Sequence, residues 1–65
     1  MNNEIIKAFR RVYSESEASI LEITDTGTPQ KVISAKFADG IFHFIVGEST
    51  VSPSYDTKDE ALKNI

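Results

Sequence analysis

Two apolar runs, residues 31–38 (KVISAKFA) and 41–46 (IFHFIV), are separated only by Asp39-Gly40. Runs rich in β-branched and aromatic residues are typical of strands, and Asp-Gly between two such runs is the strongest local signal for a β-hairpin. A type I′ turn at Asp39-Gly40 requires positive φ at both residues and pairs the two residues that flank it. We therefore predict an antiparallel hairpin in this segment.

The predicted pairing determines which side chains share a face of the sheet, because side chains alternate along a strand. It places Lys36 opposite His43, the single histidine of the chain. One face, named the apolar face, carries Ile33, Ala35, Phe37, Phe42, Phe44 and Val46. The other, named the mixed face, carries Val32, Ser34, Lys36, Ile41, His43 and Ile45.

An amphipathic helix is predicted at the N-terminal end. Apolar residues recur at three- and four-residue spacing over residues 3–13, which is the helical period. Residues 18–24 (ASILEIT) then read as a first strand, and residues 25–29 (DTGTP) have the composition of a turn. The chain thus enters the predicted hairpin from a helix and a strand.

A second helix is predicted within residues 55–65. Thr57 and Glu60 have the spacing of a capping box, in which the two side chains satisfy free N–H groups at a helix start. The predicted fold class is α+β, in the order α-β-β-β-α. Residues 1–65 form a single small domain: a three-stranded antiparallel meander with both helices packed on the apolar face.

The small size of the chain limits its stability. A domain of 65 residues buries only about 60% of the surface that its unfolded chain exposes. Cysteine is absent, so disulfides and thiolate ligands cannot add support. With one histidine and scattered carboxylates we expect no metal site and no cofactor. We expect the support to come from self-association or from docking on another protein.

The composition also bears on location. A chain without cysteine suits a reducing compartment. The N-terminal residues show no leader pattern, and no apolar run approaches the ~20 residues needed to span a bilayer. We predict a cytoplasmic protein with no membrane contact.

Two features could indicate an enzyme. Asp25-Thr26-Gly27 resembles the triplet of aspartic proteases, and Ile45-Val46-Gly47 resembles the segment that braces it in retroviral-type enzymes. That chemistry needs two carboxylates sharing a proton, and these residue types are also ordinary in turns. His43 could act as a general base, but no nucleophile elbow or glycine-rich oxyanion loop accompanies it. We predict no catalysis and no small-molecule substrate.

The mixed face is the predicted partner-binding site, because no predicted helix covers it. Its contact residues are expected to be Val32, Lys36, Ile41, His43 and Ile45. We predict a small acidic, non-catalytic interaction or regulatory module that binds another protein or a second copy of itself. The sequence leaves homodimer and hetero-complex open.

The alternative function is nucleic-acid binding. Lys7, Arg10 and Arg11 lie at i, i+3 and i+4 and form one basic patch for an anionic partner. We rank this alternative second, because a net charge of −3 opposes binding to phosphates.

The α-β-β-β-α order and the chain length resemble the double-stranded RNA-binding domain. In that family the second helix opens with a Lys-Lys-x-Ala-Lys motif whose lysines contact phosphates. Lys58 and Ala61 match this motif, whereas Asp59 and Leu62 replace two of its lysines. The resemblance implies RNA binding through Lys58 together with the basic patch.

Overall fold

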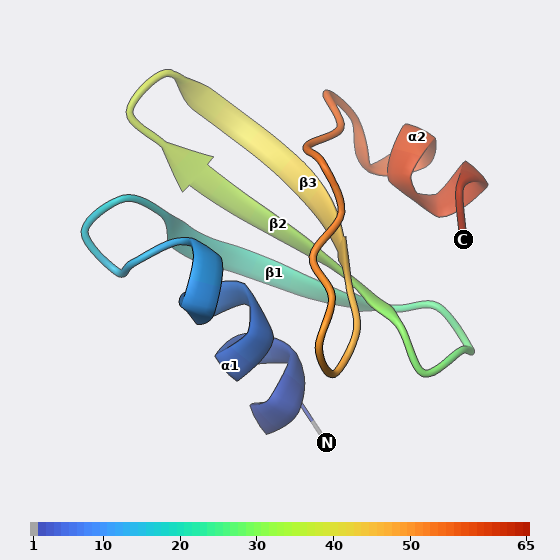
Figure 1. The fold of residues 1–65 in the computed structure, drawn as a ribbon. Helices are drawn as coiled ribbons and strands as arrows, with labels where there is room; N and C mark the ends of the chain where they lie inside the picture. Colours follow the sequence, from blue (N-terminus) through green and yellow to red (C-terminus); the bar gives the residue numbers. More distant parts are fainter. Residues whose placement is uncertain (1) are drawn as a thin grey trace.

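The computed structural model describes residues 2–65 (Figure 1). The elements follow in the order α1 (Asn3–Val12), β1 (Ser19–Asp25), β2 (Lys31–Phe37), β3 (Gly40–Val46) and α2 (Lys58–Lys63). The strands form one antiparallel sheet in the order β1-β2-β3. This confirms the α+β class and the α-β-β-β-α meander. Within residues 2–65, neither helix is long and apolar enough to cross a membrane.

The hairpin turn lies one residue earlier than predicted. Phe37 pairs with Gly40, so the loop between the strands is Ala38-Asp39. Gly40 has φ +144°, whereas no non-glycine residue among residues 2–65 has positive φ. Asp39 therefore does not adopt the type I′ conformation, and Gly40 takes the positive φ as the first residue of β3.

This shift changes partners but leaves both faces intact. Each residue of β2 pairs two positions away from its predicted partner on β3, and side chains alternate with a period of two. The apolar and mixed faces therefore hold the predicted residues. His43 lies opposite Ser34, and Lys36 lies opposite Ile41, so the predicted Lys36–His43 pair is wrong.

Helix α1 covers part of the apolar face. Ile5, Ala8 and Phe9 are buried and form one cluster with apolar residues of β2 and β3. Phe9 and Phe44 meet edge to face with ring centroids 5.3 Å apart. Burial of these side chains supplies the main stabilising term of so small a fold.

Helix α2 packs on the mixed face, so the prediction that both helices share the apolar face is wrong. Ala61 is fully buried in a cluster with Val32 and Ile45, and Tyr55 packs against that cluster. Figure 1 shows α1 and α2 well separated on the two sides of the sheet. Val32 and Ile45 supply the apolar surface that this short helix needs, because a helix of six residues is unstable alone.

The chain reaches the mixed face by crossing the outer edge of β3. Val51 pairs with Val46 and packs on the apolar-face cluster, whereas Tyr55 pairs with His43 and packs on the mixed-face cluster. The sequence left open whether residues 49–54 form an ordered edge or a mobile loop; in the structure residues 51–55 pair with β3 as an edge segment.

Candidate functional site

Backbone pairing across the three strands arranges the mixed face in three rows. They are an outer row (Ser19, Lys36, Ile41), a central row (Glu22, Ser34, His43) and an inner row (Thr24, Val32, Ile45). The outer row lies at the β2–β3 turn and the inner row lies under α2. The three rows differ in solvent exposure, and that difference determines whether each row can contact a partner.

The inner row is closed to a partner. Val32 is fully buried and Ile45 is 7% exposed, both in the cluster with Ala61. These two residues were predicted to contact a partner, and in the folded chain they instead hold α2. The error follows from the expected position of α2, because a helix on the apolar face would have left them open.

The central row contains two neighbouring residues, Ser34 and His43, that the predicted register did not pair. Ser34 Oγ and His43 Nδ1 share a hydrogen bond of 2.7 Å across β2 and β3. Ser34 is 4% exposed, so its hydroxyl cannot be reached by a substrate. The pair resembles a nucleophile and its base in residue type only, and its role is to satisfy a buried hydroxyl.

Removal of His43 and removal of Ser34 should destabilise the fold by different amounts. His43→Leu leaves the buried Ser34 hydroxyl without a partner and should lower the free energy of unfolding by about 1–3 kcal/mol. Ser34→Ala leaves a half-exposed imidazole that water can solvate, so its cost should be below about 1 kcal/mol. Urea unfolding of both variants tests this asymmetry. Equal losses in the free energy of unfolding would mean that the hydrogen bond to His43 does not satisfy the Ser34 hydroxyl.

Glu22, at the other end of the central row, links the sheet to α2. Lys58 Nζ lies 2.6 Å from Glu22 Oε1. The hydrogen bond and positive charge of Lys58 lower the pKa of the Glu22 carboxyl. Because the pKa of Glu22 is lowered in the folded state, the ion pair stabilises the fold at pH values above the ordinary glutamate pKa. This stabilisation is lost as the pH falls from there through the lowered pKa of the folded state.

Lys58→Gln tests this link. The variant removes the charge that favours the ionised carboxylate, so the pKa of Glu22 should rise towards that of an isolated glutamate. A pH titration of the Glu22 side-chain carbon by NMR measures the change, with Lys63→Gln as the matched control on the same helix. An unchanged pKa in Lys58→Gln would mean that the ion pair is not populated in solution.

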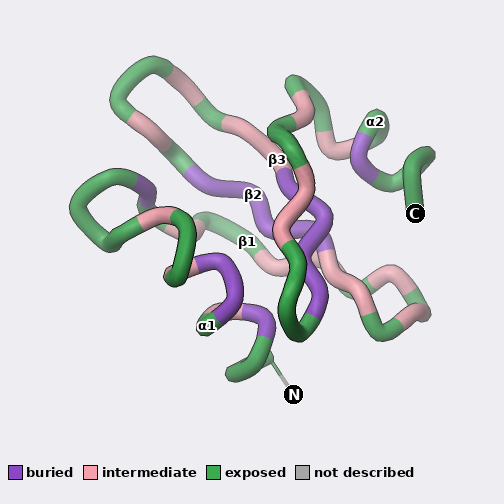
Figure 2. Tube along the Cα trace, viewed as in Figure 1, coloured by how far each residue is buried: buried purple, intermediate pink, exposed green. Residues whose placement is uncertain are grey.

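The outer row is open to solvent. All three residues are exposed, and Ile41 retains 49% of its accessible surface. Figure 2 shows the buried stretch in the middle of the sheet, while the β2–β3 turn is coloured as exposed and intermediate. Of the five predicted contact residues, Lys36, Ile41 and the half-buried His43 therefore remain accessible.

The apolar face is also uncovered at this end of the sheet, which sequence reasoning missed. Phe37 and Phe42 are only half-buried. A hollow of about 220 Å³ is lined by Tyr13, Phe37, Asp39, Phe42, Phe44 and Ser54, and we name it the aromatic hollow. A helix of ten residues is only about 15 Å long, whereas seven-residue strands extend about 23 Å. One helix cannot cover the whole face.

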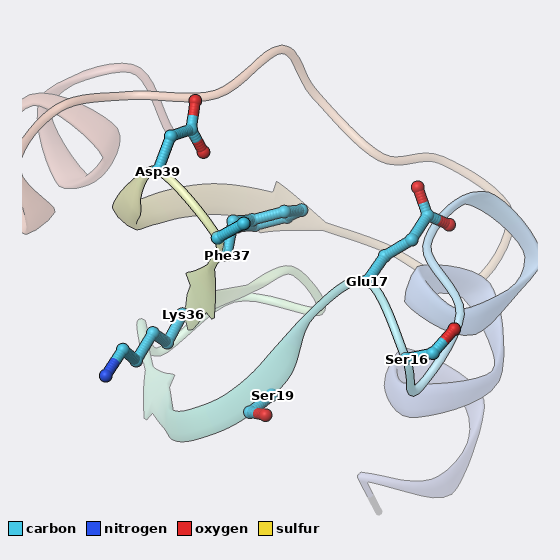
Figure 3. Close-up of a pocket in the computed structure, with 7 residues that line it drawn as sticks. Ser16, Glu17, Ser19, Lys36, Phe37 and Asp39 are labelled. Atoms are coloured by element: carbon cyan, nitrogen blue, oxygen red, sulfur yellow. The ribbon is translucent and has the colours of Figure 1, made fainter.

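A second, wider hollow adjoins the aromatic hollow. It measures about 590 Å³, is lined by residues of the α1–β1 loop and the β2–β3 turn, and shares Phe37 and Asp39 with the aromatic hollow. In Figure 3 the Phe37 ring lies between the Asp39 and Glu17 side chains, whereas Lys36 extends away from both. The charged groups do not converge on one point as catalytic groups would.

Two of the four cations predicted to contact an anion are occupied within the fold. The Arg10 guanidinium donates to the carbonyls of Ser14 and Ala18 at 2.9 and 2.7 Å, where it closes the loop after α1. Lys58 is paired with Glu22. Lys7 and Arg11 are exposed on α1. The pattern of basic residues did not reveal these internal partners.

The Asp25-Thr26-Gly27 triplet lies where β1 ends and the β1–β2 turn begins. Asp25 Oδ1 accepts from the Gly27 N–H at 3.1 Å and lies 3.0 Å from Lys31 Nζ. The hydrogen bond from Lys31, with that of Gly27, lowers the pKa of the Asp25 carboxyl. In the structure this carboxylate thus stabilises the turn and pairs with Lys31.

No family model, no curated protein and no solved structure matches the chain.

Proposed function

We propose that this protein is a non-catalytic protein-interaction module that acts through the open end of its sheet. The open end comprises the outer row of the mixed face and the half-exposed rings of the apolar face, Phe37 and Phe42. The observation that carries the proposal is that α1 and α2 both leave this end uncovered, on opposite faces of the same hairpin.

The physical argument concerns apolar exposure in a small domain. Ile41, Phe37 and Phe42 keep accessible surface that a partner could remove from water, and each Å² of apolar surface so buried contributes about 25 cal/mol. Contiguous exposed apolar surface marks a contact site, whereas single exposed apolar residues are ordinary. Here Ile41 and the rings of Phe37 and Phe42 flank one turn on the two faces of the hairpin. The partner is another protein or a second copy of the chain.

The proposal is tested by capture of partners from the lysate of the source cell. Tagged wild-type protein is compared with Ile41→Asp, which places a charge in the outer row at an exposed position. The matched control is Leu62→Asp, because Leu62 is also exposed but lies on α2. We expect Ile41→Asp to lose the specific partner and Leu62→Asp to retain it.

Two further measurements separate the alternatives. Light scattering of the purified protein reports self-association, and a dimer that dissociates in Ile41→Asp would identify the partner as a second copy. Nuclease treatment of the lysate reports nucleic acid. Recovery that is lost with nuclease, or that is equal for Ile41→Asp and wild type, would contradict the proposal and direct attention to Lys7 and Arg11.

A further inference from the structure

The aromatic hollow combines ring surfaces with a carboxylate. Phe37 meets Tyr13 at a centroid distance of 5.1 Å and Phe42 at 5.8 Å, with interplanar angles of 86° and 69°. Nearly perpendicular rings present both faces and edges to the space that they line. Asp39, in the β2–β3 loop, adds an exposed carboxylate to the same hollow.

The charged side chains at the two hollows are mainly acidic. Glu17 lies on the other side of the Phe37 ring from Asp39, and Lys36 extends away from both (Figure 3). The whole chain carries a net charge of −3. A positively charged group would therefore be attracted to this end of the molecule and could be held over an aromatic ring.

The protein already makes one contact of this kind in the same aromatic cluster. The Arg10 guanidinium carbon lies 5.8 Å from the centre of the Phe9 ring, and Phe9 contacts Tyr13 at 5.2 Å. Arg10 is held there by the carbonyls of Tyr13, Ser14 and Ala18, after the end of α1, and does not itself line the hollow. The residues that line the hollow thus include rings and a carboxylate but no basic side chain.

We propose that the aromatic hollow binds an arginine side chain of the protein partner. The planar guanidinium matches the site, because it can stack on a ring while it donates two parallel hydrogen bonds to one carboxylate. A lysine ammonium is more strongly hydrated and offers no plane to stack. A volume of about 220 Å³ accommodates a single side chain. The inference deepens the proposed function and rests on it, since it specifies the chemistry of the partner at the open end.

The test is an NMR titration of the full chain with the capped tripeptide acetyl-Gly-Arg-Gly-amide. The matched neutral probe has citrulline in place of arginine, which keeps the shape and removes the charge. We expect saturable shifts of backbone amides grouped at Phe37, Asp39, Phe42 and Ser54 with the arginine probe only. A lysine tripeptide should bind more weakly at the same residues.

Three variants separate this site from general electrostatic attraction. Asp39→Asn should weaken binding about 2–5-fold, as expected for the loss of one exposed ion pair. Asp59→Asn makes the same change of net charge on α2 and should leave the affinity unchanged. Phe42→Leu keeps an apolar side chain but removes the ring, and it should weaken binding about 2–5-fold. Dispersed amide spectra of each variant establish that it is folded.

Several results would overturn the inference. They are equal shifts with the citrulline probe, shifts spread over acidic residues throughout the molecule, and equal losses in Asp39→Asn and Asp59→Asn. The arginine site can fail while the proposed function stands: if Ile41→Asp abolishes partner capture while Asp39→Asn and Phe42→Leu retain it, the interaction module stands and the arginine site does not.

Discussion

Phe44→Ala should unfold the domain, or nearly so. Phe44 is 1% exposed and its ring contacts those of Phe9, Tyr13 and Phe37 at 5.2–5.7 Å. Truncation of a buried phenylalanine costs about 3–5 kcal/mol, through lost burial and the cavity that remains. A domain of 65 residues has a total stability of only about 3–10 kcal/mol. The substitution therefore removes much or all of the free energy of unfolding.

Thermal and urea unfolding followed by circular dichroism measure this effect. The control is Phe42→Ala, on the same strand and the same face, where the ring is half-buried. Its cost should be less than half that of Phe44→Ala. Similar costs for the two variants would show that the hairpin end is buried in solution, and the open end would then not exist as described.

Ile45→Asp is the second change with a large expected effect. On the sequence alone, a charge at Ile45 would lie on an open face and disturb only association. In the structure Ile45 is 7% exposed and packs against Val32 and Ala61. A carboxylate at this position has no cation to pair with in the cluster, and an unpaired buried charge costs several kcal/mol. The variant should lose α2 from the sheet and lie close to global unfolding.

Hydrogen exchange distinguishes loss of α2 from the sheet from a variant that stays folded. In Ile45→Asp the amides of α2 should lose protection first, because the helix is short and is held mainly by Ala61. Ile41→Asp, on the same strand and the same face, should keep wild-type protection. If Ile45→Asp instead kept a protected α2, the helix would not pack on the mixed face, and the assignment of α2 would be wrong.

Local signals were enough for most of the architecture. The helical spacing of Ile5 and Phe9 predicted α1, and the capping box predicted the start of α2. In the structure the Thr57 hydroxyl accepts from the Glu60 N–H at 3.1 Å, as the motif requires. These features depend on residues within one turn or one strand of each other, so no information from the rest of the fold is needed to predict them.

The register shows where local information ends. Asp-Gly predicted a turn on those two residues, but the chain turns on Ala38-Asp39 and leaves the positive φ to Gly40. Both arrangements place the same side chains on the same face, so the hydrophobic pattern could not discriminate between them. Only the actual pairing shows that Ser34, and not Lys36, contacts His43.

The candidate site was likewise predicted only in part. Sequence reasoning placed it on the sheet and named Lys36, Ile41 and His43, which remain accessible. It also named Val32 and Ile45, which are buried, and it missed the aromatic hollow altogether. Both errors arise from one question that a linear pattern does not answer, namely which face a six-residue helix will cover.

By itself, then, the sequence determined the order of the elements and the composition of the two sheet faces, because helical period and strand alternation are properties of neighbouring residues. The tertiary structure alone decided that residues 51–55 cross the edge of β3 and carry α2 to the mixed face. With one helix on each face, and neither long enough to reach the β2–β3 turn, apolar side chains stay exposed there. The open end results from that division, since two helices on the apolar face would have covered the rings and left Val32 and Ile45 in water.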